Sequence, residues 1–180
     1  MSLVEQAKMP ISRGPHLVPT FLCFLWGGLC ALIIAAPFLM ALAQPLPAAL
    51  IYFFFSPVCH QQPERSFVLM GYSLAVCHRC FGIYAGLWAG CVIRLPARFV
   101  YRSPLWRRVI VTAGAVPLLL DALLPMAGLW TGNSMSRFFT GLLFGVMTSA
   151  LVAPGIAEVF SNLSLLRCPF RTTNAKGGVS

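Results

Sequence analysis

Three short polar segments interrupt an otherwise apolar chain of 180 residues, and each carries side chains capable of chemistry. They are Cys59-His60-Gln-Gln-Pro-Glu64-Arg65, Cys77-His78-Arg79-Cys80 and Asn133-Ser-Met-Ser-Arg137. Thiolates and imidazoles are the usual ligands of zinc, and thiolates also exchange disulfides. Guanidinium groups bind carboxylates and phosphates through a planar fork of donors. If the fold brings the three segments together, they form a functional site.

The first two segments contain the ligand types and the ligand number of a tetrahedral zinc site. The four candidate ligands are Cys59, His60, Cys77 and Cys80. Two of them are consecutive in the chain, so an irregular loop has to turn both toward one ion, and Pro57 and Pro63 favour such a loop. We interpret His78 as a loop residue and not as a ligand. The segment 56–80 is therefore predicted to be a metal-binding loop, with zinc as the expected ion.

The pair Cys77-x-x-Cys80 has other interpretations that the sequence leaves open. The positive N-terminal end of a helix favours thiolate over thiol, which suits disulfide exchange as well as metal binding. With Cys59 as a third thiol, the pair would serve a thiol–disulfide oxidoreductase that uses a quinone as cofactor, or it would form a structural disulfide. A c-type haem site requires histidine directly after the second cysteine, and Phe81 stands there, which excludes that site.

The arginines of the three segments suggest a further use of the same region. The candidate group contains Arg65, Arg79 and Arg137 and also Asn133 and Asp121. Asp121 lies in the apolar stretch Leu-Leu-Leu-Asp-Ala-Leu-Leu. A carboxylate in such surroundings is costly unless it faces the protein interior and finds a partner. The group is predicted to form ion pairs or to bind an anion. In the second case the protein would be a transporter or would bind anionic lipid.

The composition predicts a membrane protein, because 58% of the residues are hydrophobic and only 9% are charged. Four apolar runs, 17–43, 76–93, 109–124 and 138–160, have about the length that crosses a bilayer. We therefore expect an all-α membrane protein, a bundle of about four transmembrane helices. The apolar segment 46–58 is too short to span and is expected to be re-entrant or interfacial.

The distribution of charge identifies the expected partner and the orientation. The chain has 13 Lys+Arg and 4 Asp+Glu, but the basic residues punctuate apolar runs, which indicates a lipid bilayer and excludes nucleic acid. With four spans, ten of the basic residues share one side: Lys8, Arg13, Arg94, Arg98, Arg102, Arg107, Arg108, Arg167, Arg171 and Lys176. The positive-inside rule makes that side cytoplasmic. The loop 56–80 would then face the periplasm or exterior of a bacterial inner membrane.

The domain organisation follows from these spans. A cytoplasmic tail, 1–16, precedes a single transmembrane domain, 17–160, and a second cytoplasmic tail, 161–180, is expected to be disordered. A cleaved signal peptide is the competing interpretation of the N-terminus, because Ala41-Leu42-Ala43 resembles a cleavage site. The first apolar run of about 27 residues is much longer than the ~7–15 residues of a signal sequence, so we expect it to remain as a helix.

Glycines recur every four residues in two of the expected spans. They are Gly82, Gly86 and Gly90 in one span, and Gly141 and Gly145 in another. Small residues at this spacing let helix backbones approach each other closely in lipid. A close contact between these two spans would hold Cys80 near Arg137. The same glycines would alternatively serve a homo-oligomer.

The motifs around these residues resemble those of an uncharacterised bacterial family of multi-pass membrane proteins, called domain of unknown function 2085. Its pattern is matched by Cys59-His60, Pro63-Glu64-Arg65-Ser66-Phe67 and Cys77-His78-Arg79-Cys80-Phe81-Gly82-Ile83-Tyr84-Ala85-Gly86. The later matches are Asp121, Asn133, Arg137, Thr140-Gly141 and Phe144-Gly145. The similarity covers roughly residues 55 to 150. It implies a multi-pass membrane protein and supplies no established activity.

Overall fold

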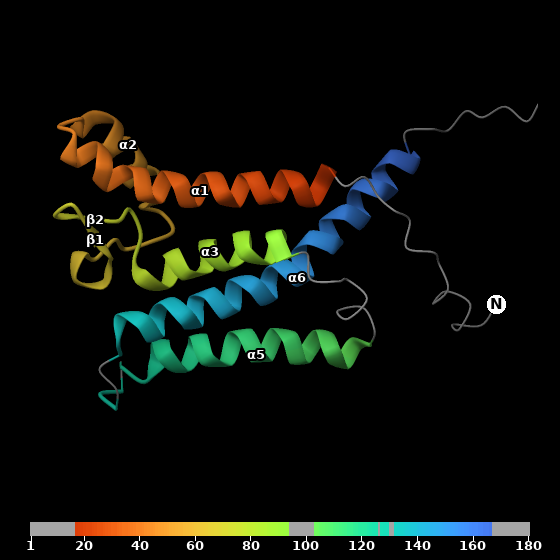
Figure 1. Cartoon of the computed structure of the whole chain (residues 1–180). Helices are drawn as coiled ribbons and strands as arrows, with labels where there is room; N and C mark the ends of the chain where they lie inside the picture. The colour runs from red at the N-terminus through yellow and green to blue at the C-terminus, as the bar shows by residue number, and fades with distance from the viewer. Residues whose placement is uncertain (1–16, 94–102, 126, 130–131, 167–180) are drawn as a thin grey trace, which may run out of the picture.

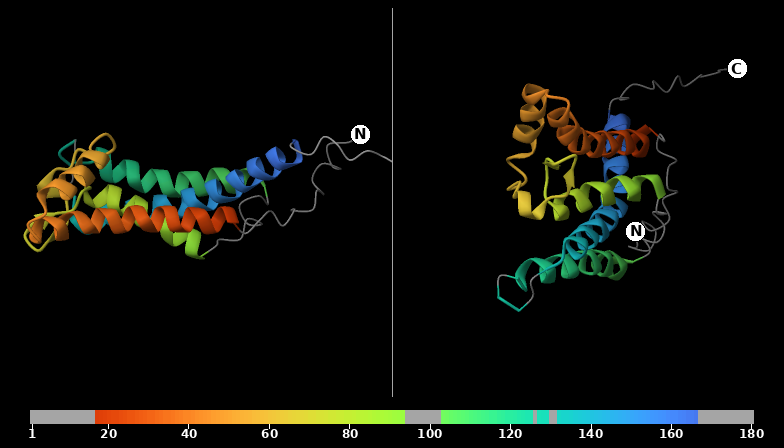
Figure 2. Two further views of the ribbon diagram at one scale, coloured as in Figure 1. Left: turned by 90° about the horizontal axis from the view of Figure 1, so that it is seen from above. Right: turned by 60° about the vertical axis from the view of Figure 1, so that its left-hand side comes forward.

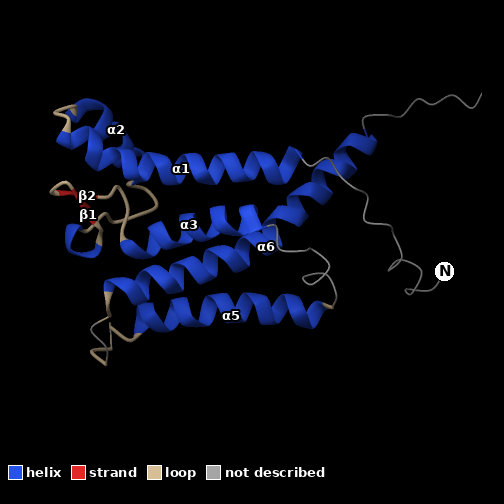
Figure 3. Ribbon diagram, viewed as in Figure 1, coloured by secondary structure: helices blue, strands red, loops and turns tan. Residues whose placement is uncertain are grey.

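The computed structural model describes residues 17–93, 103–125, 127–129 and 132–166, and these residues are mostly helical (Figures 1 and 3). The helices are α1 (Leu17–Ala41), α2 (Pro45–Phe55), α3 (His78–Ile93), α5 (Pro104–Leu123) and α6 (Ser134–Leu166). A short 3-10 helix, η2 (Pro63–Arg65), and two antiparallel strands, β1 (Val68–Leu69) and β2 (Tyr72–Ser73), lie between α2 and α3. The expected tail 1–16 and residues 167–180 of the expected tail 161–180 lie outside the described residues, whereas residues 161–166 continue α6.

Four helices run side by side between the same two ends of the molecule (Figures 1 and 2). α3 packs most extensively against α6 and also contacts α1, while α5 packs against the other side of α6. α2 folds back beside the last turns of α1, and the two strands lie at the same end. We call this the loop end. It also contains the beginning of α3, the end of α5 and the beginning of α6, so all three polar segments of the sequence reach it.

The contact between α3 and α6 is a contact between backbones. The glycines that lie in it are Gly82, Gly86, Gly90, Gly141 and Gly145. A Cβ atom added at Gly86 would lie 2.2 Å from the backbone oxygen of Leu142, and one added at Gly145 would lie 2.3 Å from that of Ile83. Only glycine permits so close an approach, as in other helix pairs packed through small residues. Contacts within one chain therefore already occupy the glycine faces.

The main buried cluster lies beneath the loop end. It combines Ile33 and Ala36 of α1, Phe55 of α2 and the segment 74–76 with Cys59. Elsewhere many large apolar side chains are exposed, among them Phe24 at 77% and Phe53 at 76%. So much exposed apolar surface is typical of a protein that lies in a membrane. In the described part of the chain, Val18–Ala41 and Ser134–Val152 are long and apolar enough to cross one.

The other two expected spans fall short of that criterion. α3 has 16 residues, and α5 carries Arg107, Arg108 and Asp121. α5 also begins earlier than the expected 109, because Ser103 accepts the backbone N–H of Trp106 and Pro104 stands in the first turn, two features that start a helix. Of the ten basic residues used for orientation, only Arg107 and Arg108 lie in the described residues.

The hairpin of β1 and β2 departs from the expected all-α fold. Val68 pairs with Ser73 and Leu69 with Tyr72, which leaves Met70 and Gly71 as a two-residue turn. Both have positive φ angles, 51° and 84°, as a type I′ turn requires. Methionine seldom adopts that conformation, so the composition of this stretch did not indicate a turn. The segment 46–58, expected to be re-entrant or interfacial, contains α2, which contacts α1.

Candidate metal centre

Three cysteines from two separate segments converge at the loop end. The Sγ atoms of Cys59, Cys77 and Cys80 all lie within 4.8 Å of one another, and none of the three forms a disulfide. Zn–S bonds of about 2.3 Å in a tetrahedral site place sulfurs about 3.8 Å apart. The three thiols are therefore close to the spacing that a single ion requires.

The beginning of α3 orients two of these cysteines. Cys77 directly precedes the helix, and its carbonyl accepts the N–H of Phe81 at 2.9 Å, so Cys77 and Cys80 lie on one helical turn. The backbone N–H of Cys77 donates to the Sγ of Cys59 at 3.2 Å, which ties the two segments together. Hydrogen bonding with the sulfurs of Cys59 and then Cys80 lowers the pKa of the Cys77 thiol. The cluster thus favours a thiolate, the form that binds metal.

A glutamine fixes the loop that follows Cys59. The side-chain Nε2 of Gln61 donates to the carbonyl of Tyr52 at 2.6 Å and to that of Ala75 at 2.9 Å. Its backbone adopts a left-handed φ of 49°. Gln61 therefore links α2 to the segment that leads into Cys77, and the hydroxyl of Tyr52 adds a bond to the carbonyl of Ser73. Our sequence interpretation missed this role; the only signal was an amide inside a polar, proline-flanked segment.

Replacing Gln61 by alanine should loosen this loop. Two carbonyl groups would lose their donor, and each unsatisfied group costs about 1–3 kcal/mol when it is shielded from water. We expect a lower unfolding temperature in detergent and faster modification of Cys59 by a maleimide. The neighbouring Gln62 is exposed, which makes Gln62→Ala the matched control. Equal behaviour of the two variants would contradict the role assigned to Gln61.

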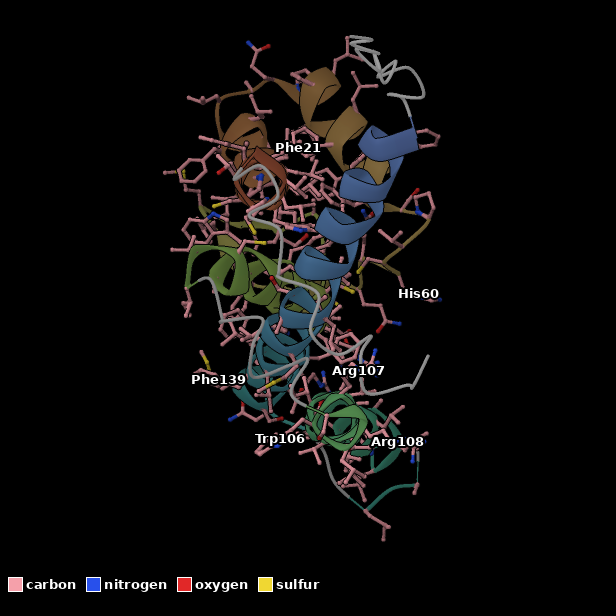
Figure 4. The ribbon with its side chains drawn as sticks, turned by 90° about the vertical axis from the view of Figure 1, so that its right-hand side faces the viewer. Phe21, His60, Trp106, Arg107, Arg108 and Phe139 are labelled. Carbon is pink, nitrogen blue, oxygen red and sulfur yellow. The ribbon has the colours of Figure 1, made fainter. Side chains whose placement is uncertain are left out.

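The two histidines of the motifs lie in different surroundings. His60 is exposed and does not belong to the group of three sulfurs, although it lines the same cavity; Figure 4 shows it at the edge of the molecule. His78 is the first residue of α3 and is buried, with its ring 4.3 Å from that of Phe67 in an edge-on contact. His78 therefore packs within the folded loop end, where we had expected a loop residue.

An ion pair and a hydrogen bond connect three helices next to the cysteines. The Nη2 of Arg79 in α3 lies 2.6 Å from the Oδ2 of Asp121 in α5, and also donates to the carbonyl of Asp121 at 2.9 Å. The hydroxyl of Ser136 in α6 donates to the Oδ1 at 2.8 Å. The Asp121 side chain is only 6% exposed, and these bonds satisfy both of its oxygens. The carboxylate of Asp121, which the sequence predicted to be costly without a partner, is therefore paired with Arg79.

A cavity of about 580 Å³ opens beside the cysteines. Among the residues that line it are the three cysteines, His60 and the arginines Arg65, Arg79 and Arg137. Seven of the residues singled out in the sequence therefore share one cavity. Asn133 lies apart from it: the residue is exposed at the beginning of α6, and its backbone carbonyl accepts the N–H of Arg137 at 3.1 Å.

Comparison with known proteins agrees with the motifs. Residues 59–151 match the family described as "Predicted membrane protein (DUF2085)". An uncharacterised protein of Methanocaldococcus jannaschii is 31% identical over 109 residues, which cover 61% of this chain and 70% of that protein. An uncharacterised protein of Methanothermobacter thermautotrophicus is 30% identical over 99 residues, which cover 54% of this chain and 86% of that protein.

Both relatives are archaeal, so the family extends beyond the bacteria to which the resemblance first pointed. No solved structure matches the chain significantly. The matched region contains the three cysteines, the Arg79–Asp121 pair and the glycine contact between α3 and α6. The chain belongs to the DUF2085 family of predicted membrane proteins.

Proposed function

We propose that this protein is an integral membrane protein in which Cys59, Cys77 and Cys80 bind one zinc ion that holds the loop end together. The observation that carries the proposal is the approach of three sulfurs, from two segments, to within 4.8 Å. Soft thiolate ligands select zinc among the common divalent ions. His60 is the candidate fourth ligand, because it follows Cys59 directly and lines the same cavity. The exposed imidazole would have to turn toward the three sulfurs to complete the tetrahedron.

Elemental analysis of the detergent-purified protein should find about one equivalent of zinc, as a single tetrahedral site requires. Cys59→Ser and Cys80→Ser should abolish it, whereas Cys23→Ser, a partly exposed cysteine of α1, should not. His60→Ala should release zinc to a chelator more readily if the imidazole is the fourth ligand. Retention of zinc by Cys80→Ser would refute the site.

We also propose that α1, α3, α5 and α6 all cross the membrane, with the loop end on the exterior side. Arg107 and Arg108 support this orientation, because they lie at the beginning of α5, which faces the viewer in Figure 4, opposite the loop end. The burial of Ile33 and Ala36 in the main cluster supports a retained α1 over a cleaved signal peptide. A membrane-impermeant maleimide added to intact cells after zinc chelation should label Cys59; labelling from the cytoplasmic side alone would reverse the orientation.

A second function, disulfide exchange linked to a quinone, is favoured by one observation. Cys77 has two thiols beside it, because the three sulfurs lie within 4.8 Å of one another, so a partner for a disulfide is close at hand. In such a reaction Cys77 and Cys80 would form a disulfide, and their two electrons and two protons would reduce the quinone to a quinol. Thiol counting on the zinc-analysis sample separates zinc binding from disulfide chemistry, and reduction of that disulfide by added quinol would distinguish a redox-active disulfide from a structural one.

A further inference from the structure

We infer that the cavity beside the cysteines binds a phosphate group, which Arg65 and Arg137 hold. The inference adds a ligand to the proposed zinc site and rests on that proposal only for the charge of the cysteine cluster. The two arginines come from different elements: Arg65 ends η2 in the loop, and Arg137 lies in the first turn of α6. The cavity they line therefore lies between the loop and the helix bundle.

The charge of the lining favours an anion. Three of the lining residues are arginines, and none of the described lining residues is acidic. Asp121 compensates Arg79 through the 2.6 Å ion pair. A zinc ion with three thiolates would carry only one net negative charge, so the cysteine cluster would not by itself offset the arginines of the lining. An anionic ligand would interact favourably with them inside a partly enclosed space, where charges interact more strongly than in bulk water.

The shape and the remaining lining indicate a phosphate ester. Guanidinium groups bind phosphate oxygens with paired donors, and two of them on separate elements suit an anion that presents oxygens in several directions. The volume of about 580 Å³ falls within the ~300–1,000 Å³ typical of small-molecule sites. Val58, Ile83, Ala122 and Pro125 form an apolar part of the wall, which would contact an uncharged portion of the ligand. A phospholipid headgroup and a soluble phosphate ester both have this chemistry.

The test uses the full-length protein purified in detergent. Its unfolding temperature is followed as inorganic phosphate is added, with sodium chloride of matched ionic strength as the reference. A second arm adds short-chain phosphatidylglycerol, with short-chain diacylglycerol as the reference. The variants are Arg65→Gln and Arg137→Gln, and the control is Arg108→Gln, which removes an exposed charge at the opposite end of α5. Because Arg65 is exposed, Arg65→Gln should fold and is the decisive variant.

We expect the wild type and Arg108→Gln to bind phosphate or phosphatidylglycerol, and Arg65→Gln to bind about 10-fold more weakly or worse, the effect of losing a charge-assisted hydrogen bond. Stabilisation by phosphatidylglycerol alone assigns a lipid headgroup, and stabilisation by inorganic phosphate assigns a soluble compound. No stabilisation in either arm, or unchanged binding by Arg65→Gln, would overturn the inference.

Zinc content measured on the same samples separates this inference from the proposed function. Zinc without phosphate binding would refute the inference and leave the zinc site standing. Phosphate binding that depends on Arg65 in a zinc-free protein would support the inference and refute the zinc site.

Discussion

Replacing Asp121 by alanine should lower the free energy of unfolding by about 3 kcal/mol, the cost of removing one member of a buried ion pair. The carboxylate is 6% exposed, and it accepts hydrogen bonds from Arg79 and Ser136. Without it, the guanidinium of Arg79 would keep its charge with its main partner gone. The Arg79 side chain is 28% exposed, so its unpaired charge would be only partly buried. We therefore place the expected loss at the low end of the range for buried pairs. Thermal unfolding in detergent measures the effect.

Two further variants show whether the loss comes from the unpaired charge. The double variant Arg79→Met, Asp121→Leu removes both charges and should recover much of the stability, because well-packed apolar residues can replace a buried ion pair with little loss. Glu64→Gln is the control for removing an acidic residue, since Glu64 is exposed in η2. If the double variant were no more stable than Asp121→Ala, packing and not charge would explain the effect.

The meeting of the three polar segments at one end could be predicted from hydropathy. When apolar runs of spanning length follow one another, the segments between them lie alternately at the two ends of the bundle. The polar segments at Cys59, Cys77 and Asn133 were therefore expected on one side, and the described helices bring them there. Asp121 could also be expected to find a partner, because a carboxylate among leucines is too costly to leave alone.

The details of the loop could not be predicted in the same way. The exposed His60 is followed by Gln61, whose backbone is left-handed, and glutamine does not signal such a conformation. The turn at Met70 is hidden for the same reason. Hydrogen bonds between side chains and distant carbonyls, such as those of Gln61, depend on the tertiary structure and leave no pattern along the chain.

The glycine contact connects the stability of the bundle to the candidate site. Arg79 and Cys80 lie on the first turn of α3, and Arg137 lies on the first turn of α6. A Cβ atom at Gly141 would lie 2.3 Å from the backbone oxygen of Arg79, so the two helices touch directly beside these residues. Any separation of α3 from α6 would move the cysteines relative to Arg137. The geometry of the cavity therefore depends on residues that have no side chain.

Replacing Gly145 by alanine should accordingly destabilise the protein by about 3 kcal/mol, near the upper end of the usual cost of overpacking. The new Cβ would lie 2.3 Å from the backbone oxygen of Ile83 and 2.9 Å from the Cα of Gly86. Backbone atoms cannot rotate away as a flexible side chain would, so the two helices have to separate. The unfolding temperature in detergent measures the loss, and chelator competition should show weaker zinc retention.

Gly155→Ala provides the matched control because it makes the same change in the same helix. Within the described part of the chain, nothing lies within 4 Å of a Cβ atom added at Gly155, so the substitution meets open space there. Alanine is a better helix former than glycine by about 1 kcal/mol, and this variant should therefore be as stable as the wild type or more stable. The difference between the two variants isolates the close helix contact from helix propensity. If Gly145→Ala were as stable as Gly155→Ala, α3 and α6 would not be in backbone contact, and the alignment of Cys80 with Arg137 would need another cause.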